Sequence, residues 1–468
     1  MKTMTTNIFD FKLKQFNRKA FKNYFNTVEW NVFGKVFNII GTIVEAVMPS
    51  IKLGTQVRII IDKDNFIPAE VVGFKEDKAL LLPFSNLNGI APGCKVEIYR
   101  VLDTIKVGDF LLGNIIDPFI NSLTSNGITF PINCDEVPLD KPPPNPVERQ
   151  RIIEPLGVGV RAIDGLLTLA NGQRIGIMAG SGVGKSVLMG MIAQSSEADV
   201  NVIGLIGERG REVKEFIDKD LGKEGLKKSV VVVVTSDQSP LMKIRGAKVL
   251  IAIAEYFSSK GKKVMLMMDS LTRVAMAQRE IGLAIGEPPT TKGYTPSVFS
   301  LLPKLLERSG SQKQGFGAIT SLYTVLVDAD DFNEPIADTA RSILDGHINL
   351  TRKLAYKGHF PAIDISSSIS RLMADVVDKE HYDIAIRIKE LIGIYEENLD
   401  LIQIGAYQIG TNPKLDQAIK LMPAIESFLK QDKKDHSNLN IAIEQMRSIL
   451  QDNTTLNMSS NGHFNYAA

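Results

Sequence analysis

Residues 174–191 read RIGIMAGSGVGKSVLMGM, and this stretch decides the fold class. The apolar run Arg174–Met178 is typical of a buried strand, and it passes through a glycine-rich turn into a segment with a helical composition. In this order of strand, turn and helix, glycines let backbone N–H groups converge on phosphate oxygens. The stretch therefore predicts a nucleotide-phosphate site formed by Ala179, Gly180, Ser181, Gly182, Val183, Gly184, Lys185, Ser186 and Val187.

Two residues of this loop carry particular chemistry. Lys185 can reach the β and γ phosphates of a nucleotide, and Ser186 is placed to hold Mg²⁺. Ala179 stands where the usual pattern has glycine, while the glycines at 180, 182 and 184 are all present. A glycine-rich turn that only joins a strand to a helix is the alternative interpretation, and the flanking strand and helix make it the weaker one.

A second anchor for the metal is expected at the end of a neighbouring strand. The apolar run Val264–Met268 ends in Asp269, which we expect to hold Mg²⁺ together with Ser186. An aspartate at a strand end can also cap the following helix, and the residues alone leave that alternative open.

Hydrolysis needs a group that orients and deprotonates water. The apolar run Val202–Gly207 delivers Glu208 at its end, which is where an open α/β sheet binds its ligands. Because Glu208 follows Lys185 by one helix and one strand, we expect it beside the γ phosphate. From the residues alone, a salt bridge to Arg209 or Arg211 explains this carboxylate equally well.

Beyond residue 150, apolar runs alternate with longer helical segments. Continuous apolar runs separated by helices predict a mostly parallel sheet covered on both faces. After about Asp378 these runs stop, and residues 380–452 have a helical pattern in which Tyr382 and Leu391 belong to one apolar face. The expected strands are Arg174–Met178, Val200–Ile206, Ser229–Val234, Val264–Met268 and Ala318–Val325.

The first third of the chain has a different pattern. Short β-branched runs broken by glycines over residues 36–99 predict a small β-barrel. The stretch Lys141–Pro146 predicts a stiff, extended connection because proline restricts the backbone. Residues 9–25 predict a basic amphipathic helix, which could pack on its own chain or dock on a partner helix or an anionic membrane. The expected parts are a docking helix (1–35), a β-barrel (36–105), a linker (106–150), a nucleotide-binding domain (151–378), a helical domain (379–452) and a flexible tail (453–468).

Composition and charge restrict the class of protein. The chain has 468 residues and a formal net charge of +1, whereas a dedicated nucleic-acid binder usually has a larger basic excess. Cys94 and Cys134 are too few for a disulfide framework. The first residues lack the apolar segment of a secretory signal, and no apolar run has the length of a membrane span. We therefore expect a soluble protein of the cytoplasm.

Several longer strings carry a family resemblance. Together with the phosphate loop they resemble the rotary-type ATPases of type III protein export, from about residue 36 to 430, and within that family the flagellum-specific export ATPases. The resemblance implies an α/β protein with a small N-terminal β-barrel that serves oligomerisation, a central RecA-like P-loop domain with a mostly parallel sheet, and a C-terminal helical domain. The strings are GERGREVKEFI (207–217), GVGVRAIDGLL (157–167), AIGEPP (284–289), ILDGHI (343–348) and PAIDI (361–365).

The resemblance also implies roles for single residues. Glu208 is then the general base that activates water, and Lys185 and Arg209 belong to the same catalytic set. Arg371 corresponds to an arginine finger that reaches the γ phosphate from a neighbouring subunit. Phe360 occupies the position of an aromatic ring that stacks on adenine, although packing in the core would also explain it.

An expected assembly and set of partners follow from these roles. Because Glu208 and Arg371 lie on one chain, a ring of identical subunits could complete every active site, and we expect a homohexamer. The resemblance implies Mg²⁺-dependent ATP hydrolysis that powers or gates flagellar protein export at the cytoplasmic face of the inner membrane. Its implied partners are a regulatory stalk protein, a central stalk protein, the export gate and export chaperone–substrate complexes, with peripheral membrane contact and no nucleic acid.

Three alternatives stay open. The ATPase of a virulence type III secretion injectisome would share the chemistry and differ in its partners. A RecA-like hexameric nucleic-acid motor also joins a small barrel to such a domain, but the near-neutral charge and the absence of aromatic and basic alternation on the barrel strands argue against it. A non-catalytic ring subunit or scaffold would need neither Glu208 nor an intact phosphate loop.

Overall fold

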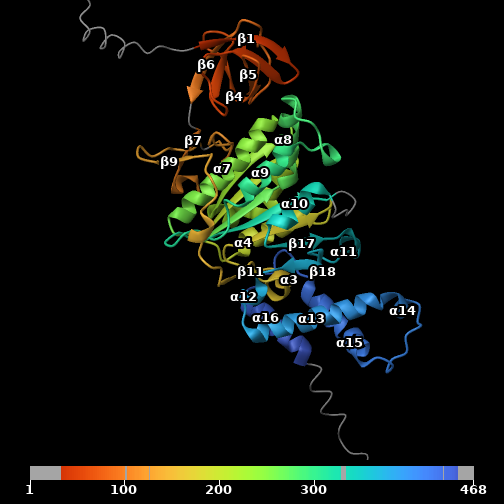
Figure 1. The fold of residues 1–468 in the computed structure, drawn as a ribbon. Helices are drawn as coiled ribbons and strands as arrows, with labels where there is room; N and C mark the ends of the chain where they lie inside the picture. The colour runs from red at the N-terminus through yellow and green to blue at the C-terminus, as the bar shows by residue number, and fades with distance from the viewer. Residues whose placement is uncertain (1–32, 101–102, 126, 328–333, 436, 452–468) are drawn as a thin grey trace, which may run out of the picture. The chain divides into compact units, whose positions relative to one another are not determined.

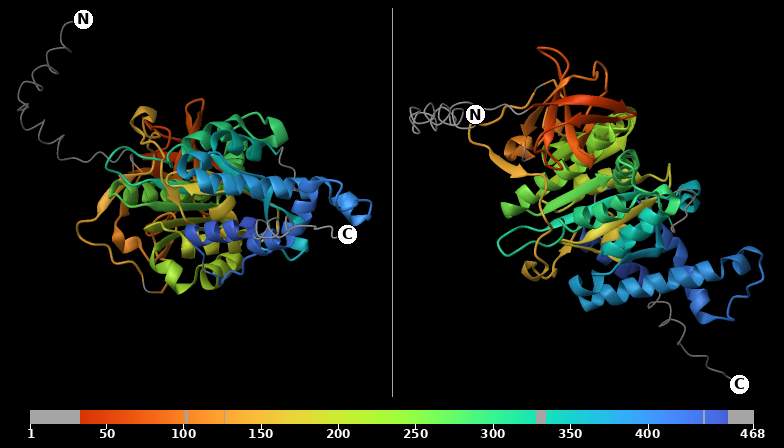
Figure 2. Two further views of the ribbon diagram at one scale, coloured as in Figure 1. Left: turned by 90° about the horizontal axis from the view of Figure 1, so that it is seen from below. Right: turned by 45° about the horizontal axis from the view of Figure 1, so that its top comes forward.

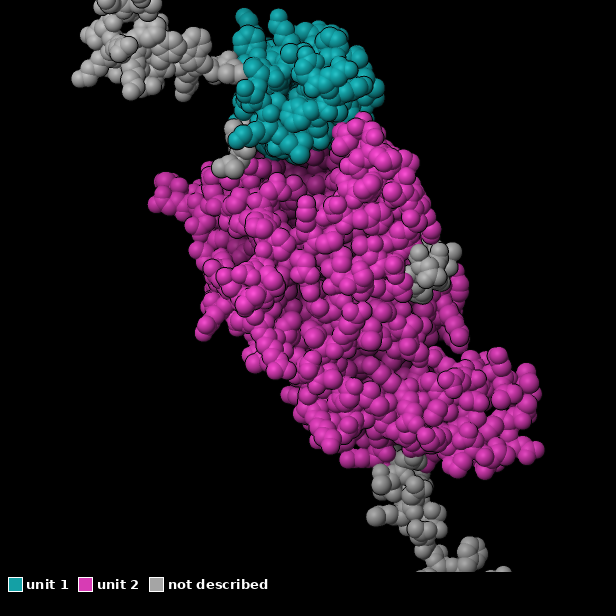
Figure 3. All heavy atoms as spheres, viewed as in Figure 1, with its two compact units in different colours: residues 1–101 teal, residues 102–468 magenta. Residues whose placement is uncertain are grey.

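The computed structural model describes residues 33–451 except 101–102, 126, 328–333 and 436. The docking helix expected within residues 1–35 and the tail expected at 453–468 lie outside the described residues, apart from residues 33–35. The chain divides into two compact units, residues 1–101 and 102–468, which Figure 3 shows in different colours. Each unit is described by itself below.

The first unit is the predicted β-barrel. Six antiparallel strands close in the order β1-β2-β5-β4-β3-β6. Side chains alternate along each strand, so one set, including Val36, Val57, Ile59 and Leu81, fills the barrel interior. The strands are β1 (Phe33–Ile40), β2 (Ile43–Val47), β3 (Gln56–Ile60), β4 (Phe66–Lys75), β5 (Lys78–Pro83) and β6 (Lys95–Arg100).

The barrel exterior carries aromatic–cation pairs that the sequence analysis did not expect. Aromatic rings and cations do meet there: the Arg58 guanidinium lies 3.8 Å from the Tyr99 ring centroid and 4.5 Å from that of Phe66, and Lys78 lies 3.8 Å from the Phe37 centroid. The members of each pair come from different strands, so no alternation along a single strand reveals them.

The second unit is built on an eight-stranded sheet. Its order is β18-β17-β12-β16-β15-β13-β14-β8, and every neighbouring pair is parallel except β17 and β18. All five predicted strands are present as β12, β13, β14, β15 and β16. The strands are β18 (Ile363–Ser370), β17 (Gly346–Leu350), β12 (Arg174–Ala179), β16 (Ile319–Leu326), β15 (Val264–Asp269), β13 (Val200–Glu208), β14 (Ser229–Thr235) and β8 (Ile115–Ile116).

Helices cover both faces of this sheet (Figures 1 and 2). Helix α7 (Pro240–Ser259) lies against β13 so closely that a Cβ on Gly204 would meet the Leu250 side chain at 2.6 Å. Helices α8 (Leu271–Ala284) and α9 (Pro296–Leu306) pack beside α7. The opposite face packs on α4 (Lys185–Ser195), α5 (Gly210–Glu215), η3 (Phe216–Leu221) and α6 (Gly222–Lys227). The predicted doubly covered sheet is therefore confirmed.

Residues 106–150 form more than the linker that the sequence analysis expected. Within the second unit they supply β8, the edge strand beside β14, and β9 (Asp135–Pro138), which pairs with β7 (Thr104–Val107). The buried Arg245 of α7 donates to the Pro118 carbonyl at 3.0 Å and so fixes this segment to the sheet domain. A two-residue strand such as Ile115–Ile116 is too short for a hydrophobic pattern to predict. Two 3₁₀ turns, η1 (Asp109–Leu111) and η2 (Pro146–Glu148), complete the segment.

The C-terminal part is helical, as predicted, and shares one core with the sheet domain. Asp378 caps the first of its helices by accepting from the His381 N–H at 2.8 Å. Short helix α3 (Arg161–Leu166) packs against this part so closely that a Cβ on Gly165 would lie 2.9 Å from the Met446 sulfur. The helices are α13 (Lys379–Glu397), α14 (Leu399–Gln403), α15 (Pro413–Leu429) and α16 (Leu439–Gln451).

The remaining elements of the second unit are short. Among the described residues, no helix combines the length and apolar character needed to cross a bilayer. These elements are β10 (Pro155–Leu156), β11 (Leu169–Ala170), η4 (Thr291–Gly293), α10 (Pro335–Ile343), α11 (Arg352–Tyr356) and α12 (Met373–Val376).

Candidate active site

The predicted phosphate loop joins the carboxyl end of β12 to the first turn of α4. Gly182 and Gly184 have φ values of +79° and +86°, a left-handed conformation that glycine adopts without steric cost. Gly184 is the N-cap of α4, and Lys185 is its first helical residue. The loop therefore presents successive backbone N–H groups at a helix N-terminus, the arrangement that binds phosphate.

Three charged side chains meet beside this loop. The Lys185 Nζ atom lies 2.5 Å from Asp269 Oδ1 and 3.7 Å from Glu208 Oε1. They meet at the carboxyl ends of the parallel strands, because Asp269 ends β15, Glu208 ends β13 and Lys185 follows β12. The structure thus brings together the phosphate-binding lysine, the expected metal ligand and the expected base.

Asp269 is fixed by a neighbour that the sequence analysis missed. Thr324 of β16 donates from its hydroxyl to Asp269 Oδ1 at 2.7 Å, because β16 lies between β12 and β15. Ser186 follows Lys185 on the first turn of α4. One serine hydroxyl and one carboxylate are oxygen donors that suit Mg²⁺, which prefers few protein ligands and completes its shell with phosphates and water.

Glu208 has the electrostatic environment of a general base. Burial and, next, the neighbouring Asp269 carboxylate raise the pKa of Glu208 to about 7, while Lys185 opposes this shift. A base with a pKa near the operating pH can both accept and release a proton. Within the part of the chain that the structure describes, Glu208 forms its ion pair with Lys185, whereas Arg209 pairs with Glu212.

Arg209 lies apart from this cluster. Its side chain is 77% exposed and pairs with Glu212, with 3.1 Å between Nη1 and Oε1. As the N-cap residue of α5, Arg209 has an extended backbone that turns its side chain outward. The structure does not bring it to Lys185 or Asp269.

Phe360 stands next to the phosphate loop. A Cβ built on Gly184 would lie 3.4 Å from Phe360 Cδ1, and the phenyl side chain is 45% exposed. Such a half-exposed ring offers a face for a base, whereas a ring packed in the core would be covered. Gln431, which the sequence analysis missed, donates from its backbone N–H to the Phe360 carbonyl at 2.9 Å.

Arg371 lies at the amino-terminal ends of the parallel strands, opposite the end that carries the phosphate loop. It follows β18, whose last residue Ser370 pairs with Gly346 at the start of β17. Its N–H donates to the Asp345 carbonyl, and the Asp345 N–H donates to Arg174, the first residue of β12. The phosphate loop begins at the other end of β12, about 16 Å away at roughly 3.3 Å per residue. The exposed Arg371 side chain therefore lies far from the phosphate loop of its own chain.

Arg273 lies next to the site, and the sequence analysis did not select it. It lies in the first turn of α8, four residues after Asp269, and a Cβ on Gly207 would meet its Cβ at 2.8 Å. Its aliphatic stem thus packs on the residue before Glu208. A cation in the first turn after the metal-anchoring strand is the signal that could have identified it.

Known proteins share this architecture. Three family models match in order: the ATP synthase alpha/beta family beta-barrel domain (36–99), the nucleotide-binding domain of that family (159–370) and the T3SS EscN ATPase C-terminal domain (377–448). The flagellum-specific ATP synthase of Bacillus subtilis (strain 168) is 53% identical over 425 residues, which are 90% of this chain and 96% of the relative. The chain belongs to the flagellar and type III secretion ATPases of the ATP synthase alpha/beta family.

Solved structures support the assignment of this chain to the family. The assembled ATPase EscN from the type III secretion system of enteropathogenic E. coli has a TM-score of 0.84 and 48% identity, covering 89% of this chain and all of EscN. EscN in complex with its central stalk EscO matches with a TM-score of 0.82 and 47% identity over the same shares. This ATPase thus has the barrel, the mostly parallel sheet and the C-terminal helices of its family. Its membership of that family makes it an ATP-hydrolysing enzyme.

Proposed function

We propose that this ATPase hydrolyses ATP with Mg²⁺ to power or gate the export of flagellar proteins through a type III export apparatus. The observation that carries the proposal is the cluster of Lys185, Glu208 and Asp269 beside an intact phosphate loop, in a chain 53% identical to a flagellum-specific ATP synthase. The flagellar name belongs to the relative. The evidence from this chain itself is the cluster, which can supply the chemistry of ATP hydrolysis.

Each residue of the cluster has one task in the proposed reaction. Lys185 leaves its carboxylate partners to neutralise the β and γ phosphates, which the loop N–H groups also bind. Ser186 and Asp269 would hold Mg²⁺, which would supply positive charge to neutralise the phosphates. Glu208 accepts the proton of the attacking water, and Phe360 stacks on adenine.

The arginine finger is proposed to come from another subunit. Arg371 lies at the sheet edge opposite the phosphate loop, so it can stabilise transition-state charge only in a neighbouring active site. A closed ring of identical chains, which we propose is a homohexamer, supplies one finger to every site, and the assembled form of EscN supports self-assembly. The EscN–EscO complex likewise supports a central stalk partner.

The remaining partners belong to the same proposal. A regulatory stalk protein, the export gate and export chaperone–substrate complexes would bind this ATPase at the cytoplasmic face of the inner membrane. Residues 9–25 contain the basic amphipathic pattern that would dock the regulatory stalk protein or touch anionic lipid.

Mixed variants test the reaction and the ring together. Glu208→Gln removes the base but keeps its finger, and Arg371→Ala removes the finger but keeps its base. We expect each variant alone to lose Mg²⁺-dependent phosphate release, and an equimolar mixture to regain part of it. Wild-type activity of Arg371→Ala would refute the finger assignment, and full activity of a strictly monomeric enzyme would refute the ring.

The injectisome alternative needs a cellular test, because the EscN structures make it a real competitor. We expect the native chain, but not Glu208→Gln, to restore motility to a Bacillus subtilis strain that lacks its flagellum-specific ATP synthase. Restored secretion in an enteropathogenic E. coli strain lacking EscN, without restored motility, would favour the injectisome.

A nucleic-acid motor is a second candidate function, and the observation that favours it is the set of aromatic–cation pairs on the barrel. Stimulation of phosphate release by RNA, in preference to export chaperones, would favour it.

A further inference from the structure

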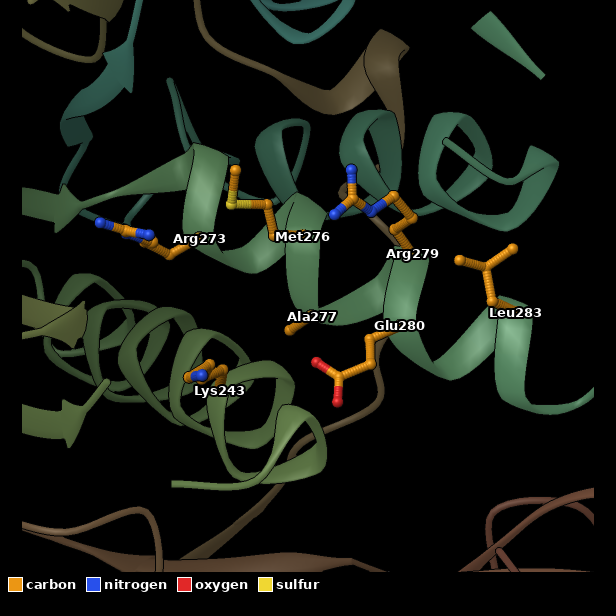
Figure 4. A pocket seen from close by; sticks show the side chains of 7 residues that line it. All are labelled: Lys243, Arg273, Met276, Ala277, Arg279, Glu280 and Leu283. Atoms are coloured by element: carbon orange, nitrogen blue, oxygen red, sulfur yellow. The ribbon is translucent and has the colours of Figure 1, made fainter. Parts of the chain in front are cut away.

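A charged pocket lies between α7 and α8 on the second unit. Its volume is about 390 Å³, which is in the range of ligand-sized cavities. Lys243 enters from α7 and the other side chains from α8, as Figure 4 shows. We name this the α7–α8 pocket, and it is lined by Lys243, Arg273, Met276, Ala277, Arg279, Glu280 and Leu283.

The lining is basic. It contains three cations, Lys243, Arg273 and Arg279, and one carboxylate, Glu280, so it has an excess of two positive charges. The Lys243 Nζ atom donates to the Ser236 carbonyl, and the Arg279 guanidinium lies 5.3 Å from the centroid of the Tyr294 ring. Within the described part of the chain, the Arg273 Nε atom is buried without a hydrogen-bond partner. An anionic ligand would offset the excess positive charge of the lining.

The pocket is also partly apolar. Met276 and Ala277 form part of the wall, and Leu283 at one end of the lining is 45% exposed. Inorganic phosphate would use the cations and leave this apolar surface in water. A peptide segment with acidic and apolar side chains would use both kinds of surface.

The inner end of the pocket contacts the strand that carries Glu208. Arg273 packs on Gly207, as described above. Lys243 Nζ donates to the Ser236 carbonyl at 3.1 Å, and the Ser236 N–H donates to the Glu208 carbonyl at 3.0 Å. A ligand in the pocket would therefore contact two side chains that touch the catalytic strand or its neighbour.

We propose that the α7–α8 pocket is a docking site for an acidic segment of a protein partner. Carboxylates of the segment bind Lys243, Arg273 and Arg279, and an apolar side chain covers Met276 and Leu283. The occupant is distinct from ATP, which the phosphate loop binds, so the proposal goes beyond the function proposed above.

Binding of a labelled acidic peptide to the full chain, without nucleotide, tests this site. The probe is a fluorescein-labelled peptide of alternating glutamate and leucine, followed by anisotropy. We expect saturable binding that weakens about threefold in Lys243→Met and in Arg279→Gln, as for partly exposed ion pairs. Glu280→Gln should instead tighten binding about threefold, because it removes the repelling carboxylate.

A matched control separates the pocket from general charge attraction. Lys304→Met removes an exposed cation of α9 that does not line the pocket, and it should leave the affinity unchanged. Equal weakening by Lys304→Met, or unchanged binding in both pocket variants, would overturn the proposal. Displacement of the peptide by inorganic phosphate at the same concentration of anionic groups would also overturn it, since a small-anion site would then suffice. Circular dichroism of each variant confirms that it is folded, and the outcome does not depend on ATP hydrolysis.

Discussion

Glu208 shows how one residue depends on its surroundings in the fold. An isolated glutamate is ionised at neutral pH, but this side chain is enclosed beside Asp269, and its pKa rises to about 7. Lys185 is close enough to limit that rise without cancelling it. The protonation state of the Glu208 carboxyl group therefore changes within the physiological range.

The pH dependence of catalysis follows from this pKa. The base must be deprotonated to accept a proton from water, so we expect kcat/KM for ATP to fall as the pH drops below about 7. Glu208→Gln should lower kcat by about 10²- to 10⁴-fold, the usual contribution of a general base. Steady-state phosphate release between pH 5.5 and 9 measures both effects. A flat kcat/KM profile across pH 6–8 would contradict the assignment.

The same pKa predicts an effect on stability without nucleotide. A carboxyl whose pKa is higher in the folded state stabilises the fold below its unfolded pKa of about 4.5, and that contribution is lost as the pH rises through about 7. Glu208→Gln stays neutral at every pH. We therefore expect it to be more stable than the native chain at pH 8, on the order of 1 kcal/mol after allowing for solvent screening. Thermal midpoints at pH 5 and pH 8 measure the difference, which should be small at pH 5.

At the level of secondary structure, contacts between elements override intrinsic preferences. Gly190 lies in the middle of α4, where alanine would normally be the better helix former. In this fold α4 packs on η3, and a Cβ on Gly190 would lie 2.7 Å from the Asp220 carbonyl oxygen. The helix therefore needs glycine for its packing.

Two glycine substitutions test this explanation. Gly190→Ala should destabilise the protein by about 1–3 kcal/mol, since a backbone carbonyl cannot move aside easily. Gly393→Ala in α13 is the matched control, because nothing lies within 4 Å of its added Cβ, and it should stabilise by roughly 0.5–1 kcal/mol. Denaturant unfolding of both variants measures the free energies. Stabilisation by both substitutions would show that helix propensity alone decides.

At the level of the whole molecule, the sheet separates the two halves of the proposed catalytic machinery. Lys185, Asp269 and Glu208 lie at its carboxyl-terminal edge, whereas the antiparallel course of β18 carries Arg371 to the amino-terminal edge. Each chain can therefore contribute its Lys185 cluster to one active site and its Arg371 to a different one. This division is the structural reason to expect an oligomer.

Activity should depend on protein concentration as a result. We expect specific phosphate release to rise with concentration and to level off where mass photometry shows the ring. Arg371→Ala should reach the same mass and have activity lower by about 10³-fold, in line with the loss of an arginine finger. Specific activity that is constant from dilute to concentrated solution, with no change of mass, would contradict this expectation.

The sequence by itself determined the parts that depend on neighbouring residues. The run from Arg174 to Met191 carried a strand, a glycine turn and a helix start in consecutive residues, and long apolar runs marked β13, β14, β15 and β16. Asp269 and Glu208 could be selected because each directly follows such a run. These signals are local, so no knowledge of the fold was needed.

Only the tertiary structure decided which distant segments meet. The strand order placed Thr324 beside Asp269 and Arg273 on Gly207, and the antiparallel β18 placed Arg371 at the far edge. The two-residue β8 was likewise hidden in a segment expected to be a linker. The physical reason is that pairing between strands far apart in the chain depends on their mutual packing, which no single stretch of sequence encodes.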